Sequence, residues 1–233
     1  MTQSARLSAT AERVGAYLLP AFAIVLVSSV VLSSPGAAAE EGFSRPPITK
    51  DRIPFGDERK RQMAAYSSRH YGRRTWRLRR PRQIVLHYTV SSTYPPVYNT
   101  FAANAPALGE SPGVCAHYVV DKDGTIYRLV RPGIRCRHTI GLNHRSIGIE
   151  IVQEGGGSPE RAILNRNRQR RAAQKLAGWL CGRYEIRVKD VIGHAMANDS
   201  RYFRDRAGWR NDHTDWSAPF VREFRRGLRD LRD

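Results

Sequence analysis

The chain has 233 residues, which is enough for one domain of ordinary size and an export segment but leaves little room for two full domains. A hydrophobic content of 41% fits a globular protein with a core. A formal net charge of +18 with a pI near 10.7 does not fit a neutral cytosolic enzyme. It implies a polyanionic neighbour: nucleic acid, a phospholipid surface or an acidic wall polymer.

Residues 1–39 have the pattern of a secretory signal peptide. Arg6 and Arg13 precede an apolar stretch over residues 15–32, and an Ala-x-Ala site follows. The alternative is an uncleaved membrane anchor, because the stretch is close to the minimum for a span; Pro20 and the alanine site favour cleavage. Either way we expect a secreted or cell-envelope protein, in the periplasm or cell wall. This location argues against nucleic acid as a partner and favours an anionic cell-wall surface.

Residues 40–81 are expected to form a basic lead-in with one short helix. Asp57 is a candidate cap for that helix, which runs to about His70 with Gly72 as its stop. Seven arginines fall within residues 69–82, interleaved with aromatic and apolar residues. These arginines either bind the wall or form a solvated face whose aromatic neighbours pack into the core.

Beyond the lead-in, residues 82–233 are expected to form the catalytic domain, in which short apolar runs alternate with turns. Residues 84–88 and 147–152 predict two buried strands. An Asp-Gly turn between residues 117–120 and 125–130 predicts a β-hairpin.

The other segments of this domain predict helices and one more strand. Residues 91–113 look like a long loop with at most one helical turn, and residues 165–183 predict a helix with one apolar face. Residues 188–193 predict a short strand, and Ser217 is a candidate cap for a final amphipathic helix. Together these elements predict a mixed α/β fold: a central mixed β-sheet flanked by helices.

The three cysteines are Cys115, Cys136 and Cys181. An oxidising compartment permits one disulfide, and Cys115 and Cys136 are the candidate pair because they flank the hairpin. There is no CxxC spacing, so the sequence does not support a zinc site built from cysteines.

Three polar residues stand at the ends of predicted buried strands: His87, Glu150 and His194. Functional side chains collect at such positions, although a lone histidine there is more often a hydrogen-bonded structural residue. Glu150 lies between two isoleucines. Because a bare buried carboxylate is costly, it must be neutralised, paired or bound to a metal.

The segment His213-Thr214-Asp215 adds two candidates. Asp215 either caps the turn before the last helix or serves as an oxygen ligand. Two imidazoles and one carboxylate leave a fourth position open on zinc, which is the pattern of catalytic sites. In this interpretation His87, His194 and Asp215 hold Zn²⁺. Glu150 then carries the proton as general base and acid, and His213 donates to the developing oxyanion.

Five motifs, in this order, resemble the type-2 N-acetylmuramoyl-L-alanine amidases, the family that includes bacteriophage lysozyme amidases and the peptidoglycan recognition proteins. They are Ile84-Val85-Leu86-His87-Tyr88-Thr89, Cys115-Ala116-His117-Tyr118-Val119-Val120, Ser146-Ile147-Gly148-Ile149-Glu150, Gly193-His194 and His213-Thr214-Asp215. The resemblance covers about residues 82–231. It implies that family's fold and zinc-dependent hydrolysis of the amide bond between the lactyl group of N-acetylmuramic acid and L-alanine in peptidoglycan.

The resemblance also implies roles for single residues. It places His87, His194 and Asp215 on the family's zinc ligands and Glu150 on its catalytic glutamate. His213 stands where many relatives carry a lysine that stabilises the transition state, and it could itself displace Asp215 as a ligand.

Three further residues are expected to contact substrate. His138 matches a position that lines the family's substrate groove, and we add His117 and Tyr88 from the neighbouring motifs. The sequence departs from the family pattern at Arg137, where a tryptophan is usual, which could alter glycan contacts. A second departure is Trp216, which begins a segment that is usually Pro-Gly-Pro and bears on the geometry of this loop and on the role of His213.

Other functions remain possible at this point. A metal-free peptidoglycan-binding module of the same fold would lack a ligand, and none is missing. A nucleic-acid or membrane-surface binder driven by the arginines would be sensitive to salt and insensitive to chelators. A glycosidase needs paired carboxylates, and Glu150 has no second partner. We expect a monomeric enzyme.

Overall fold

The computed structural model describes residues 43–231. The segment predicted to be a signal peptide or membrane anchor, residues 1–39, lies outside the described residues. Within residues 43–231 every helix is too short or too polar to cross a bilayer.

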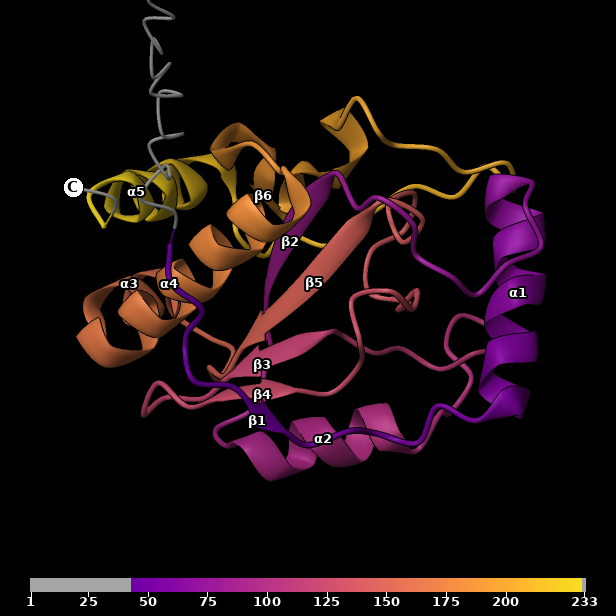
Figure 1. Ribbon diagram of the computed structural model, residues 1–233, viewed down its shortest axis with the longest axis horizontal. Coiled ribbons are helices and arrows are strands. Elements are labelled where there is room, and N and C mark those ends of the chain that lie inside the picture. The colour runs from indigo at the N-terminus through magenta and orange to yellow at the C-terminus, as the bar shows by residue number, and fades with distance from the viewer. Residues whose placement is uncertain (1–42, 232–233) are drawn as a thin grey trace, which may run out of the picture. The chain divides into compact units, whose positions relative to one another are not determined.

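A six-stranded mixed sheet forms the centre of the described chain (Figure 1), with the strand order β1-β4-β3-β5-β2-β6. β2 pairs in parallel with both β5 and β6, whereas β3 and β4 form the predicted antiparallel hairpin. The predicted mixed sheet is therefore confirmed. The strands are β1 (Thr49–Lys50), β2 (Gln83–Tyr88), β3 (Tyr118–Val120), β4 (Ile126–Arg128), β5 (Ser146–Ile151) and β6 (Val191–Gly193).

Within residues 43–231 five α-helices surround the sheet, and three of them, α3, α4 and α5, lie together on one side of it (Figure 1). Side chains alternate along a strand, so Ile84, Leu86 and Ile149 face the core that these helices cover. His87 and Glu150 therefore face the other side of the sheet. The helices are α1 (Asp57–Tyr71), α2 (Tyr94–Ala102), α3 (Pro159–Asn165), α4 (Asn167–Tyr184) and α5 (Ala218–Arg229), with 3₁₀ turns η1 (Val188–Asp190) and η2 (His194–Asp199).

The predicted helices after the lead-in and at the C-terminus are confirmed. α1 ends at Gly72, whose φ of 72° is the left-handed conformation that favours glycine. Gly56, not Asp57, is its N-cap. α5 follows Ser217, which occupies the cap position without a side-chain hydrogen bond. Tyr71 is buried, as the solvated-face interpretation of residues 69–82 expects for its aromatic residues.

Four segments differ from the sequence predictions. Residues 94–102, expected to be loop with one helical turn, form α2, because Tyr94, Val97 and Phe101 share one buried face and prolines are tolerated in a first helical turn. α3 is a separate helix ahead of α4, β1 is a two-residue edge strand in the predicted lead-in, and residues 188–190 form η1 rather than strand. Elements this short leave little periodicity in a sequence.

The predicted disulfide is not formed. Cys115 and Cys136 are free thiols, and all three cysteines, Cys181 included, are buried. Cys115 and Cys136 are neighbours, and their thiols hydrogen-bond to one another. The prediction was therefore right that Cys115 and Cys136 are neighbours and wrong that they form a disulfide, because both are buried thiols.

Candidate active site

The candidate site lies at one edge of the sheet, where three parallel strands end. His87 on β2 is the register partner of Glu150 on β5, and His194 follows the last residue of β6. Asp215 comes from the loop before α5 and joins them through its own backbone, because its carbonyl accepts the N–H of Ala195 at 2.8 Å. Residues more than 100 positions apart in the sequence therefore meet at one place.

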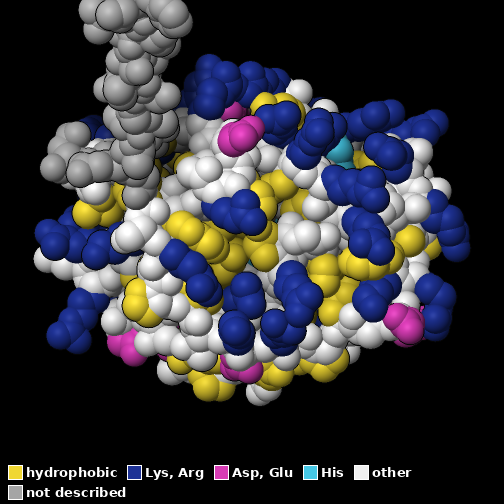
Figure 2. Space-filling model, viewed as in Figure 1, with side chains coloured by type: hydrophobic (Ala, Val, Ile, Leu, Met, Phe, Trp, Pro, Cys, Tyr) yellow, Lys and Arg dark blue, Asp and Glu magenta, His cyan; other side chains and the backbone are white. Residues whose placement is uncertain are grey.

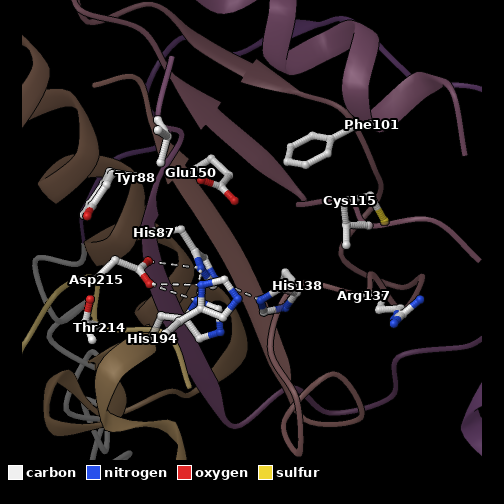
Figure 3. Close-up of a pocket in the computed structure, with 13 residues that line it drawn as sticks. His87, Tyr88, Phe101, Cys115, Arg137, His138, Glu150, His194, Thr214 and Asp215 are labelled. Atoms are coloured by element: carbon white, nitrogen blue, oxygen red, sulfur yellow. Dashed lines mark hydrogen bonds and ion pairs between the residues drawn. The ribbon is translucent and has the colours of Figure 1, made fainter. Parts of the chain in front are cut away.

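The three predicted metal ligands converge, and Figure 3 shows their side chains joined by dashed lines. His87 Nδ1 lies 3.0 Å from His194 Nδ1 and 3.5 Å from the Asp215 carboxylate, and His194 Nδ1 lies 3.1 Å from that carboxylate. Ligand atoms around a tetrahedral zinc ion are about 3.3 Å apart, given bonds of about 2.0–2.1 Å. The residues therefore fit zinc, and the metal-free alternative, which predicts a missing ligand, is not supported.

The electrostatics of this cluster also suit a metal. His87 and His194 are 3% and 4% exposed. Burial and the neighbouring His194 lower the pKa of His87 to about 4, so its imidazole is neutral at pH 7. Burial opposes ionisation of Asp215, but hydrogen bonds with His194 and His87 hold its pKa below the ordinary value. The set is thus two imidazoles and one carboxylate, and His87 and Asp215 are in the protonation states that metal binding requires.

Glu150 is placed beside the ligands with one oxygen free. Its carboxylate points into the pocket (Figure 3), and Oε2 has no hydrogen-bond partner among the described residues. Burial first, and then the charge of Asp215, raise the pKa of Glu150 to about 8. A divalent cation nearby favours the ionised carboxylate, so a bound metal and the protonation of Glu150 are electrostatically coupled.

His213 lies at the rim of the pocket. Its ring stacks on His194 with centroids 4.3 Å apart, and its side chain is 61% exposed. Its Nδ1 is 3.9 Å from Asp215, and the compact group of possible ligands consists of His87, His194 and Asp215. Burial and His194 lower the pKa of His213, so it is a neutral donor at pH 7.

Of the three predicted substrate contacts, two line the pocket and one does not. His138 and Tyr88 are lining residues. His138 Nδ1 is also 3.1 Å from His87 Nε2, so it helps to orient a metal ligand. His117 is fully buried: its Nε2 donates to the Ile134 carbonyl and its Nδ1 accepts the Gly148 N–H. The prediction for His117 is therefore wrong, because the residue serves the core of the sheet.

Arg137, which we expected to affect glycan contacts, stabilises the loop at the pocket's edge. Its guanidinium donates to the carbonyls of Ala107, Glu110 and Pro112 at 2.6, 2.6 and 3.0 Å. It also packs over the ring of Tyr66, 5.1 Å from the centroid. Arg137 is 5% exposed and is also one of the residues that line the pocket, so its expected effect on glycan contacts stays a prediction.

Trp216, the second departure from the family's sequence pattern, packs in the core of the protein. The indole is fully buried and packs edge-on against Phe224. Its backbone N–H donates to Glu160 at 2.8 Å. These contacts fix the residue that follows Asp215, so the loop holds its ligand without the usual prolines.

The sequence interpretation missed several pocket residues. Val90, Phe101, Cys115 and Thr214 also line the pocket. Phe101 belongs to the helix α2 that was expected to be loop, and nothing in the local pattern of the other three indicates a cavity.

Residues 77–216 match the sequence profile of the family described as N-acetylmuramoyl-L-alanine amidase. A comparison with curated proteins found no match.

Several solved structures are similar to the chain. The endolysin N-acetylmuramoyl-L-alanine amidase LysCS from Clostridium intestinale URNW is 22% identical, with coverage of 81% of this chain and 99% of that one and a TM-score of 0.48. A selenomethionine derivative of AmpD is 15% identical, covering 78% and 97%, with a TM-score of 0.49. The Ph2119 endolysin from the Thermus scotoductus MAT2119 bacteriophage is 18% identical, covering 76% and 98%, with a TM-score of 0.43.

Proposed function

The chain belongs to the N-acetylmuramoyl-L-alanine amidase family, and on that premise we propose which residues carry out its reaction. The enzyme hydrolyses the amide bond between the lactyl group of N-acetylmuramic acid and L-alanine in peptidoglycan. Its zinc site consists of His87, His194 and Asp215. The observation that carries the proposed roles is the free carboxylate oxygen of Glu150 beside these three ligands.

Glu150 is the general base and acid of the proposed mechanism. When bound, zinc supplies a Lewis acid that polarises the scissile carbonyl and lowers the pKa of water to about 7. Glu150 accepts the proton of the attacking water at Oε2. It then delivers that proton to the nitrogen of the departing L-alanine, which leaves as an amine.

His213 and His138 assist from two sides of the pocket. His213 is a neutral donor next to a zinc ligand, so its N–H is suited to the oxyanion that develops on the carbonyl. His138 fixes the ring of His87 by hydrogen bonding and, with Tyr88, contributes to the substrate-facing wall.

The direct test of the base is Glu150→Gln in the zinc-loaded enzyme. We expect the variant to keep its zinc but lose about 10²–10⁴-fold in turnover of a soluble muramoyl peptide, the range for a general acid–base. Glu154→Gln is the matched control, because Glu154 is an exposed carboxylate in the loop after β5. Normal turnover by Glu150→Gln would refute the assignment of the base.

We further propose that the protein works outside the cytoplasm, as a monomer, on an anionic cell-wall surface. Support comes from the signal-like pattern of residues 1–39 and from the net charge of +18. Long-range attraction to a polyanion is screened by salt. Hydrolysis of whole sacculi should therefore fall with salt more steeply than hydrolysis of a small muropeptide, and equal salt dependence would contradict the proposal.

A further inference from the structure

Arg135 is a buried cation that forms no ion pair with any residue between 43 and 231. Its side chain is 7% exposed, and neither Nε nor Nη1 has a hydrogen-bond partner among the described residues. Its guanidinium carbon lies 5.8 Å from the centroid of the Tyr71 ring. A buried, unpaired charge is costly, so such a residue indicates a missing counter-ion.

His144 lies beside Arg135 and, within residues 43–231, also has a buried polar atom whose hydrogen bonding is unsatisfied. Its ring stacks on Tyr71 with centroids 4.4 Å apart, and its buried Nδ1 has no hydrogen-bond partner in the part of the chain that the structure describes. Burial, followed by the charges of Arg135, Arg145 and Arg204, lowers the pKa of His144 to about 3. The histidine is therefore neutral at pH 7, and its ring cannot supply a compensating charge.

Exposed arginines surround this pair. Arg73 and Arg145 both lie close enough to Arg135 to disfavour its charge, and together with burial they lower its pKa to about 10. Arg73, Arg145 and Arg204 are exposed and form no ion pair within the described part of the chain. Asp205 is a carboxylate near enough to act electrostatically on Tyr71. Its Oδ2 is hydrogen-bonded to His70 Nδ1 at 2.8 Å.

This cluster is at the opposite end of the sheet from the zinc ligands. Arg145 immediately precedes β5, whereas Glu150 lies near that strand's other end, about 16 Å away at 3.3 Å per residue. Arg82 is another exposed arginine at this end of the sheet, where its backbone N–H donates to the Arg145 carbonyl. On the face in Figure 2, Lys and Arg side chains are crowded and acidic side chains are sparse.

We propose that Arg135, His144 and the surrounding Arg73, Arg145 and Arg204 form a second binding site, which takes the phosphate groups of an anionic phosphodiester polymer. Guanidinium groups bind phosphate oxygens through paired, charge-assisted hydrogen bonds, and the neutral imidazole adds one donor. The ligand would supply the counter-charge that Arg135 lacks. Neighbouring arginines such as Arg82 would meet successive phosphates of the same chain.

A soluble polymer fits this surface better than a lipid bilayer. Membrane-binding surfaces combine cations with apolar side chains that insert between lipids. The large apolar side chains exposed in the described chain are Val90 and Leu108. Val90 lines the catalytic pocket and Leu108 lies in the turn bridged by Ala107 and Glu110, so neither is a residue of the arginine cluster.

The test is binding of poly(glycerol phosphate) to the zinc-loaded protein, measured by calorimetry at fixed ionic strength. Arg135→Gln and Arg145→Gln should each weaken binding by about tenfold or more, the value of a charge-assisted hydrogen bond. Arg222→Gln on α5 removes the same charge at an exposed position and should have little effect. Arg145 is exposed, so its variant remains informative even if Arg135→Gln does not fold.

Two comparisons make the outcome decisive. Hydrolysis of a small muramoyl peptide should be unchanged in Arg145→Gln, which separates this site from the amidase reaction. Polyglutamate of similar charge and phosphatidylglycerol vesicles should bind more weakly than the phosphodiester chain. Equal losses in Arg145→Gln and Arg222→Gln, or stronger binding to polyglutamate or vesicles, would overturn the proposal.

Discussion

His87 on β2 and Glu150 on β5 are register partners in a parallel strand pair, so a zinc ligand and the proposed base leave the sheet side by side on one face. A shift of one residue in this pairing would turn one of the two side chains towards the core under α4. The apolar residues that alternate with them, such as Leu86 and Ile149, fix the register by filling that core.

The proximity of Glu150 to the zinc ligands predicts proton release on metal binding. In the metal-free protein the pKa of Glu150 is raised to about 8, so its carboxyl is mostly protonated at pH 7. A divalent cation stabilises the ionised form and expels this proton. Calorimetry of zinc binding in buffers of different ionisation enthalpy should show close to one more proton released by the wild type than by Glu150→Gln. Equal release would contradict the coupling.

Asp215 and His213 should differ in what they do for the metal. Asp215→Ala removes an atom from the ligand group and should weaken zinc binding by more than about 100-fold, beyond the effect of losing an outer partner. His213→Ala should keep its zinc and lose turnover, because its ring lies at the rim. Competition with a chromogenic chelator measures the zinc affinity of each variant. A larger loss of zinc affinity in His213→Ala than in Asp215→Ala would show that His213 is the ligand.

Gly193 should be needed for the ligands to converge. A Cβ at this position would overlap the carbonyl of Trp216, one residue after Asp215. Gly193→Ala is therefore expected to push the Asp215 loop away and to lower zinc affinity at least about tenfold. Gly182→Ala, in α4 with open space around it, is the control and should stabilise the fold by up to about 1 kcal/mol. Unchanged zinc affinity in Gly193→Ala would show that the loop is free to move.

The buried histidine His117 should make the metal-free protein sensitive to acid. Burial lowers its pKa from 6.5 to about 4, so between these values the unfolded chain binds more protons than the folded one. The contribution of neutral His117 to the free energy of unfolding is present in full above pH 6.5. It is lost as the pH falls towards 4, by about 3 kcal/mol in total. Because His87 and His144 contribute with the same sign, the loss due to His117 is the difference between wild type and His117→Gln in urea unfolding at pH 7 and pH 4.5. His117→Gln should lose less stability between these values than the wild type, and an equal loss in the two proteins would contradict the prediction.

The sequence predicted the site better than it predicted the elements around it. His87, Glu150 and His194 stand at the ends of apolar strands, and parallel strands bring such ends to one edge. Asp215 could be assigned only through its motif, because its position depends on a loop. His117 has the same local context as a site residue, and only the three-dimensional packing shows that its ring is used internally.

Other features could not be predicted because they depend on partners distant in sequence. The stabilisation of the pocket loop by Arg137 requires three carbonyls that lie 25 to 30 residues away. The helix α2 depends on a buried face completed by residues of β3 and the segments beside it. The unpaired state of Arg135 is likewise a property of the folded surroundings.

The measurement that tests the central claim most directly is mass spectrometry of purified peptidoglycan digested with and without a zinc chelator. Cleavage at the lactyl amide predicts free stem peptides that begin with L-alanine, and glycan strands whose lactyl groups are free carboxylic acids. Both products should disappear with the chelator and return when zinc is restored. New reducing sugar ends in place of these products, or the same products at full yield under chelation, would contradict the account.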